Sequence, residues 1–141
     1  MKPPPAILFA CGLNRIRSPM AAALMRRMAG PEARVDSCGV VADLDLWPDP
    51  FAEAVMIEIG LDVSGHAAKT FENLDLEAFD RVISLSAEAH QRAVDRVGEA
   101  RAEFWPTADP TLASGSRETI LNAYRAVRDE LAVRIRERIL D

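Results

Sequence analysis

The chain has 141 residues, of which 49% are hydrophobic and 28% charged, as is typical of one globular domain with a core of its own. Its formal net charge of −5, with no basic run interleaved with aromatic residues, argues against general nucleic-acid binding. The apolar stretch near the N-terminus is too short for a signal peptide or a membrane span, and two cysteines form neither a disulfide framework nor a zinc-ligand cluster.

The first half of the chain is expected to form two strand–helix pairs. An apolar strand covers about residues 5–10, and a helix over about 18–29 follows it after a short loop. A short second strand near 33–37 leads through a long loop to a helix over about 49–59. Gly60 is suited to end that helix in the left-handed conformation.

The second half repeats the alternation. A turn of helix near 74–79 precedes a third strand over 81–85 and a helix over about 87–97. A short fourth strand over 102–105 leads towards a final helix over about 116–139, whose apolar residues recur every three or four positions. Alternating strands and helices predict right-handed βαβ units, and therefore an α/β fold with a parallel sheet covered by helices on both faces.

The most informative stretch joins the first strand to the first helix. It opens with Cys11 and closes with Arg17, Ser18 and Pro19. Ser18 is a good helix N-cap, and proline fits the first helical position. A loop held between a strand and a helix N-terminus directs backbone N–H groups at one small volume, which binds oxyanions and favours the thiolate form of a cysteine. The stretch therefore predicts a nucleophilic cysteine that attacks a bound, phosphate-like anion; the alternative is a buried cysteine beside a surface arginine.

Each polar residue of this loop has an expected task. Cys11 is the nucleophile, the planar fork of Arg17 holds two oxygens of the anion, and the Ser18 hydroxyl donates to the thiolate. Asn14 tolerates a left-handed backbone and is expected to lock the loop through hydrogen bonds from its side chain to the backbone. The residues expected to bind the phosphate are Gly12, Leu13, Asn14, Arg15, Ile16, Arg17 and Ser18.

A second candidate residue lies far along the chain. In open parallel sheets, ligands bind beyond the carboxyl ends of the strands. Cys11 follows the first strand and Asp109 follows the fourth, so both are expected on the same rim. Asp109 is then placed to act as a general acid, although Asp-Pro is also common in ordinary turns.

These residues resemble the low-molecular-weight protein tyrosine phosphatase family, which carries Cys-x5-Arg-Ser-Pro after its first strand, with asparagine at the fourth position. Residues 35–39 and 60–69 are similar to two further family segments, with Lys69 where an arginine is usual. Asp109-Pro110 is similar to the family's late Asp-Pro, whose aspartate is the general acid. The resemblance implies one domain over residues 1–141, with a three-layer α/β/α architecture and a four-stranded parallel sheet in the order 2-1-3-4.

The resemblance also implies an activity: hydrolysis of phosphomonoesters, of the protein-tyrosine-phosphatase type, through a phosphocysteine. The catalytic residues are then Cys11, Arg17 and Asp109, with no metal and no cofactor. The expected partners are a phosphotyrosine protein or small phosphomonoester and phosphate- or sulfate-like anions, with no nucleic acid and no membrane. A working thiolate needs a reducing compartment, so we expect a cytoplasmic protein.

The chain departs from the family pattern at several positions. Leu13 stands where glycine is usual, and it would be strained there if the site required a positive φ. Thr111 and Leu112 follow the Asp-Pro, where tyrosine-directed members often carry aromatic residues. Trp47 or Trp105 could supply an aromatic wall instead, but packing is the simpler role for each.

Two alternatives stay open from sequence. Relatives of this fold reduce arsenate, but the intramolecular relay type needs two further cysteines after the third strand, and residues 86–109 contain none. Cys38 follows the neighbouring strand and could approach Cys11, although it more simply replaces a small apolar residue. Arsenate reduction with an external thiol therefore remains an alternative, as does a non-catalytic module that binds phosphate or phosphopeptides.

Three further polar residues receive simpler interpretations. His66 is expected to make a structural hydrogen bond, and His90 is expected to be solvated on a charged helix. Arg15 is expected to point outward, where it would favour an acidic substrate.

Overall fold

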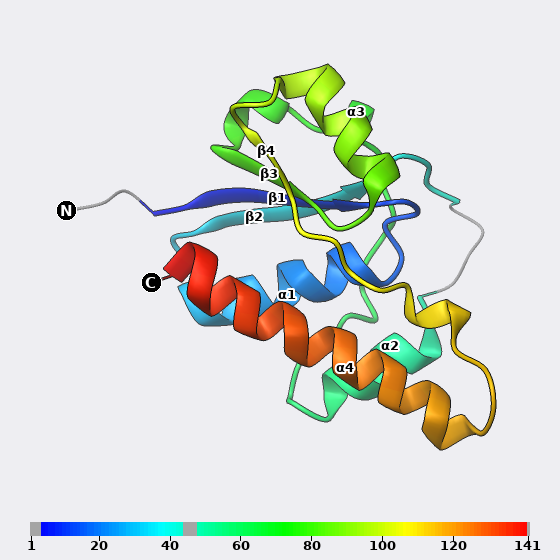
Figure 1. Ribbon diagram of the computed structural model, residues 1–141. Coiled ribbons are helices and arrows are strands. Elements are labelled where there is room, and N and C mark those ends of the chain that lie inside the picture. The colour runs from blue at the N-terminus through cyan, green and yellow to red at the C-terminus, as the bar shows by residue number, and fades with distance from the viewer. Residues whose placement is uncertain (1–3, 44–47, 141) are drawn as a thin grey trace.

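The computed structural model describes residues 4–43 and 48–140. Its centre is a four-stranded parallel sheet in the order β2-β1-β3-β4, as predicted (Figure 1). The predicted strand boundaries hold to within two residues, whereas the last α-helix ends at Ile135, four residues before its predicted end, and continues as a π turn. The strands are β1 (Ala6–Cys11), β2 (Arg34–Gly39), β3 (Arg81–Ser84) and β4 (Ala102–Phe104).

Helices cover both faces of this sheet, which confirms the three-layer α/β/α architecture (Figure 1). One face carries α1, α2 and α4, and the other carries α3. Short 3₁₀ turns lie at 71–73, 76–78 and 110–112, and the last helix ends in a π turn at 136–140. The helices are α1 (Arg17–Ala29), α2 (Pro50–Ile57), α3 (Ala87–Val97) and α4 (Arg117–Ile135).

Side-chain alternation along β1 divides the core in two. Phe9 and Cys11 belong to the cluster packed under α1, α2 and α4, whereas Leu8 and Ala10 belong to the cluster under α3. Cys38 of β2 pairs in register with Ala10 and belongs to the α3 cluster. The two cysteine side chains therefore belong to opposite faces of the sheet.

Trp105 packs in the core cluster under α1, α2 and α4. Trp105 is 2% exposed and meets Phe9 edge to face, with ring centroids 6.1 Å apart. Its role is packing, as the simpler interpretation predicted; Trp47 lies outside the described residues. In α4, Tyr124, Val127 and Leu131 are buried, which confirms the predicted apolar stripe.

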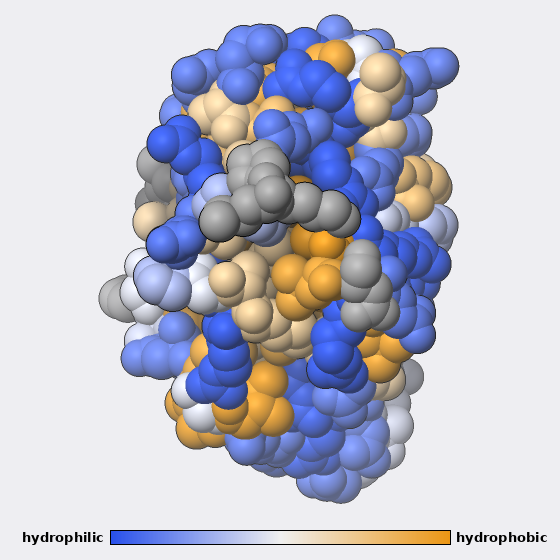
Figure 2. Space-filling model, turned by 90° about the vertical axis from the view of Figure 1, so that its left-hand side faces the viewer, coloured by the Kyte–Doolittle hydropathy of each residue, from blue (hydrophilic) through white to orange (hydrophobic). Residues whose placement is uncertain are grey.

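The two ends of the sheet differ in what they carry. Figure 2 views the amino ends of the strands, where hydrophilic surface surrounds a small apolar area. At the opposite end of the sheet, β1 ends at Cys11, and the chain that follows β4 leads to Asp109 (Figure 1). No helix within residues 4–43 and 48–140 is long and apolar enough to cross a membrane.

Candidate active site

The loop between β1 and α1 ends at a helix N-terminus that lacks a side-chain cap. Ile16 occupies the N-cap position, and no side chain accepts a hydrogen bond there. The N-termini of α2, α3 and α4 are capped instead by Asp49, Ser86 and Ser116. The prediction that Ser18 caps α1 was wrong, because the helix begins one residue earlier and the hydroxyl bonds inside the loop. The first N–H groups of α1 are thus left for a ligand.

Ser18 contacts the candidate nucleophile directly. Its Oγ lies 3.0 Å from the Cys11 Sγ and accepts a hydrogen bond of 2.9 Å from the Asn14 Nδ2. The carbonyl oxygen of Cys38 is a more distant acceptor for the same hydroxyl, at 3.4 Å. When Cys11 is a thiolate it has no proton to give, so the hydroxyl must donate to sulfur. This geometry is the one that the sequence predicts for Ser18.

The side chain of Asn14 holds the loop in its conformation. It is fully buried and adopts a φ of 54°. Its Nδ2 also donates to the Ser37 Oγ at 2.9 Å, and its Oδ1 accepts from the Lys69 backbone N–H at 3.0 Å. No other non-glycine residue in the described part of the chain has a positive φ, so Leu13 escapes the strain considered from sequence. Both predictions for Asn14, the left-handed backbone and the side-chain lock, are confirmed.

The end of β2 supports the loop from behind. A Cβ added to Gly39 would lie 2.7 Å from the Asn14 backbone nitrogen and 2.9 Å from the Gly12 carbonyl oxygen. The backbone N–H groups of Val40 and Val41 donate to that same carbonyl at 3.0 and 3.1 Å. Only glycine fits here, because the loop backbone passes directly over it. The resemblance of residues 35–39 to a family segment points to this glycine, but not to the contact that requires it.

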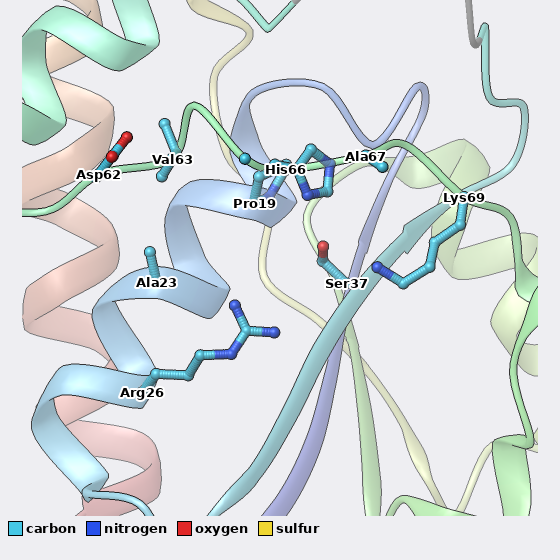
Figure 3. Close-up of a pocket in the computed structure, with 10 residues that line it drawn as sticks. Pro19, Ala23, Arg26, Ser37, Asp62, Val63, His66, Ala67 and Lys69 are labelled. Carbon is cyan, nitrogen blue, oxygen red and sulfur yellow. The ribbon is translucent and has the colours of Figure 1, made fainter.

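We call the side of the loop that packs against β2 its rear side. A hollow of about 450 Å³ lies on this side, between α1, β2 and residues 62–69. Figure 3 shows Arg26 and Lys69 pointing towards Ser37 from opposite sides of this hollow. Their Nη2 and Nζ atoms lie 3.9 and 2.8 Å from one oxygen of Asp36. Above them, the His66 Nε2 donates to the Asn14 carbonyl at 2.7 Å, and burial lowers the pKa of this imidazole. His66 thus makes the structural hydrogen bond expected of it.

On the front side, the loop forms the floor of a pocket of about 210 Å³. Cys11, Arg17 and Asp109 all line this pocket, although the acid lies more than ninety positions away in sequence. Cys11 is only 3% exposed, so its side chain lies at the bottom of this pocket. The other residues lining the pocket are Gly12, Leu13, Arg15, Ile16 and Thr111.

Two backbone contacts orient the charged groups of the pocket. The Arg17 Nη1 donates to the Thr107 carbonyl at 2.9 Å, and the Thr107 backbone N–H in turn donates to the Leu85 carbonyl at 3.1 Å. The Asp109 Oδ1 accepts from the Thr111 N–H and hydroxyl at 2.9 and 2.6 Å. Sequence reasoning missed Thr107, because a backbone carbonyl acceptor leaves no signal in residue type.

Arg15 does not simply point outward, contrary to the expectation. Its Nη1 lies 3.7 Å from the Oδ2 of Asp49, and its side chain is 29% exposed. The same Asp49 oxygen accepts from the Tyr124 hydroxyl at 3.1 Å. Burial, together with the nearby Asp49 carboxylate, raises the pKa of the Tyr124 phenol.

The remaining candidates lie away from this pocket. Cys38 is fully buried, and its pKa is raised by burial and by the charge of Cys11. The prediction of a solvated His90 was wrong: its ring stacks on Phe104 with centroids 5.1 Å apart, and its buried Nδ1 has no hydrogen-bond partner. Among the described residues, no three or more His, Cys, Asp or Glu side chains are grouped so that they could hold a metal ion.

Comparison with known proteins agrees with this geometry. A family model described as low molecular weight phosphotyrosine protein phosphatase matches residues 6–137. An arsenate reductase of Bacillus subtilis (strain 168) is 30% identical over 131 residues, covering 93% of this chain and 92% of that protein. The crystal structure of a low molecular weight protein tyrosine phosphatase from T. tengcongensis has a TM-score of 0.81 at 25% identity, covering 96% of this chain and 98% of that one. An arsenate reductase in the phosphate-binding state has a TM-score of 0.78 at 28% identity, covering 94% and 95%.

Proposed function

This chain belongs to the low molecular weight phosphotyrosine protein phosphatase family, and on that premise we propose that it hydrolyses phosphomonoesters through a phosphocysteine formed on Cys11. One observation carries the proposal: Cys11, Arg17 and Asp109, delivered by different segments, line one pocket above an uncapped helix N-terminus. A nucleophile, an oxyanion clamp and an acid in one pocket are the groups that phosphoryl transfer needs.

In the first step, the Cys11 thiolate attacks phosphorus, and the bond from phosphorus to the ester oxygen breaks. The N–H groups of residues 12–17 and the Arg17 guanidinium stabilise the charge on the three equatorial oxygens. The Thr107 carbonyl supports this by fixing one end of the guanidinium. Asp109, in its protonated form, gives its proton to the departing oxygen.

In the second step, water attacks the phosphocysteine and the sulfur–phosphorus bond breaks. The Asp109 carboxylate takes the proton from the water, which restores the acid, and phosphate leaves. The Ser18 hydroxyl, 3.0 Å from the sulfur, stabilises the departing thiolate through a hydrogen bond. No metal or cofactor takes part in either step, and we place the reaction in the cytoplasm because the thiolate needs a reducing compartment.

The two cysteines provide a matched test. Cys11→Ala is expected to abolish release of phosphate from p-nitrophenyl phosphate, because the nucleophile is lost. Cys38→Ala removes a thiol of similar burial from the other face of the sheet and is expected to keep the activity. Full activity in Cys11→Ala, with the fold intact by circular dichroism, would remove the phosphocysteine from the mechanism.

Arsenate reduction is the second candidate, and the 30% identical relative named as an arsenate reductase favours it. In this reaction the Cys11 thiolate attacks arsenic and displaces hydroxide. An external thiol then attacks the Cys11 sulfur, so that arsenite leaves and a mixed disulfide remains. A second external thiol resolves that disulfide, and two thiols are oxidised for each arsenate reduced. The external thiol is required because Cys38, the other cysteine of the chain, faces the opposite side of the sheet.

Thiol consumption separates the two candidates. A phosphatase releases phosphate from p-nitrophenyl phosphate without consuming dithiothreitol, whereas a reductase consumes dithiothreitol in proportion to the arsenate added. We expect phosphate release to exceed arsenate-dependent thiol oxidation at equal substrate concentrations. Rapid thiol oxidation with negligible phosphate release would assign the chain to the second candidate.

A further inference from the structure

The pocket holds a charged residue that the proposed mechanism does not use. Arg15 lines the pocket together with Cys11, Arg17 and Asp109. The loop N–H groups and Arg17 already account for the three equatorial oxygens of a phosphoryl group. Arg15, a second arginine of the same loop, therefore lines the pocket without a part in that mechanism.

Asp49 holds this arginine in place. It is only 6% exposed, and its Oδ1 accepts from the backbone N–H groups of Phe51 and Ala52 at 2.9 and 3.0 Å. Its Oδ2 accepts from the Tyr124 hydroxyl, so both carboxylate oxygens are fixed by hydrogen bonds. The Arg15 Nη1 lies 3.7 Å from that Oδ2, which is an ion pair longer than a hydrogen bond. Because the Asp49 carboxylate is itself fixed, its charge attracts the Arg15 guanidinium to one position beside the pocket.

The other lining residues offer little to a neutral aromatic substrate. Among the described residues, those that line the pocket beside Cys11 and the charged side chains are Gly12, Leu13, Ile16 and Thr111, and none of these four has a ring on which a phenyl group could stack. In this pocket of about 210 Å³, a second negative group on the substrate has more to bind than an aromatic ring does.

We propose that the enzyme prefers phosphomonoesters that carry a second anionic group, a carboxylate or another phosphate, within reach of the phosphoryl group, and that Arg15 binds this group. The proposal rests on the proposed phosphatase function and deepens it, because it names the class of substrate. A planar guanidinium suits both anions, since it binds either one through two parallel N–H donors.

A matched pair of substrates tests the preference. 3-Carboxyphenyl phosphate and 3-carbamoylphenyl phosphate have the same shape and differ by one negative charge. We expect kcat/KM for the carboxylate to exceed that for the amide by about tenfold, since a hydrogen bond to a charged acceptor is stronger than one to a neutral acceptor. Arg15→Gln is expected to bring this ratio close to one, and Arg15→Lys to restore part of it.

Arg117→Gln is the control, because this arginine lies over the Phe51 ring without lining the pocket, and the ratio is expected to stay at the wild-type value. A wild-type ratio near one, or a ratio that Arg15→Gln leaves unchanged, would overturn the proposal. A thermal melt of each variant shows that a lost preference does not come from a lost fold.

A binding measurement separates this proposal from the phosphatase function beneath it. In the Cys11→Ser protein, titration calorimetry with 3-carboxybenzylphosphonate and 3-carbamoylbenzylphosphonate measures the same preference without turnover. If neither ester is hydrolysed but the carboxylate still binds about tenfold more tightly through Arg15, the phosphatase function fails and the anion preference stands. Equal affinities would overturn the preference, whatever the turnover.

Discussion

The two sides of the loop between β1 and α1 are built in different ways. On the rear side, the polar groups of Asn14 are buried and bonded to Ser18, Ser37, His66 and Lys69. On the front side, charged residues from the loop and from beyond β4 line an open pocket. Buried polar groups cost free energy unless they are hydrogen-bonded, so the rear side is satisfied within the protein.

This difference teaches how a short loop can stay in one shape while offering its donors to a ligand. The rear contacts fix the backbone of the loop before any anion arrives, so little reorganisation is needed when charge develops on the front. Substitutions on the front are therefore expected to change turnover with little change in stability. Substitutions on the rear are expected to lower both.

Asp109→Asn gives the largest expected effect and probes the front. Asparagine can still accept from the Thr111 N–H, so the turn that Asp109 caps should persist. Loss of the proton donor is expected to slow turnover by about 10²–10⁴-fold, with the free energy of unfolding changed by no more than about 0.5 kcal/mol. Steady-state kinetics and urea unfolding measure the two quantities.

Asp75→Asn is the matched control, because Asp75 caps the 3₁₀ turn at 76–78 in the same way and does not line the pocket. Its turnover should equal that of the wild type. An Asp109→Asn variant with wild-type turnover would remove Asp109 from the mechanism.

Asn14→Ala probes the rear. It removes three side-chain hydrogen bonds, leaves the Lys69 N–H without its acceptor, and puts alanine at a positive φ. We expect a loss of about 2–4 kcal/mol in the free energy of unfolding, together with a lower kcat. Asn73→Ala is the control, because it removes an exposed side chain that accepts from the Thr70 N–H. Equal losses of stability in the two variants would contradict the claim that the hydrogen bonds of Asn14 hold the loop in place.

Gly39→Ala tests the close approach of the loop to β2. The added methyl group would lie under 3.0 Å from two loop backbone atoms, so the loop must move. A loss of about 1–3 kcal/mol is expected, with a raised KM for p-nitrophenyl phosphate because the phosphate site is displaced. Gly65→Ala adds the same methyl group where nothing lies within 4 Å, and it should be close to neutral. Equal effects of the two substitutions would contradict the close contact.

The sequence predicted the front of the site better than its rear. Cys11, Arg17 and Asp109 follow from strand ends and from a specific motif, because the carboxyl ends of parallel strands meet at one rim. The supports of these residues come from distant backbone atoms, such as the Thr107 carbonyl under Arg17, and residue type does not encode such partners.

Two local rules also failed for physical reasons. Ser18 has the chemistry of a helix cap, but its hydroxyl bonds to Cys11 and Asn14 instead. His90 lies on a charged helix, yet Phe104 of the neighbouring strand covers one face of its ring. In both cases a tertiary contact overrides the local preference, and the local pattern gives no sign of that contact.

The smallest expected effect concerns pH. Burial lowers the pKa of His66 below its ordinary value of 6.5, so the unfolded chain takes up a proton at a higher pH than the folded chain does. The free energy of unfolding is therefore expected to fall as the pH drops below about 6.5, and to level off once the folded imidazole is also protonated. His66→Gln keeps a donor for the Asn14 carbonyl and should flatten this part of the profile. Identical profiles between about pH 7.5 and 5.5 would show that His66 is not the group responsible.

The central claim is that the Cys11 sulfur accepts a phosphoryl group. The most direct measurement is mass spectrometry of the Asp109→Asn protein, quenched in acid during turnover of p-nitrophenyl phosphate. This substrate has a good leaving group, whereas the loss of the carboxylate slows attack by water, so the intermediate should accumulate. The account predicts one phosphoryl group on the peptide that contains Cys11, and none after Cys11→Ala. Phosphate release without any phosphorylated Cys11 peptide, or with the group on another residue, would contradict it.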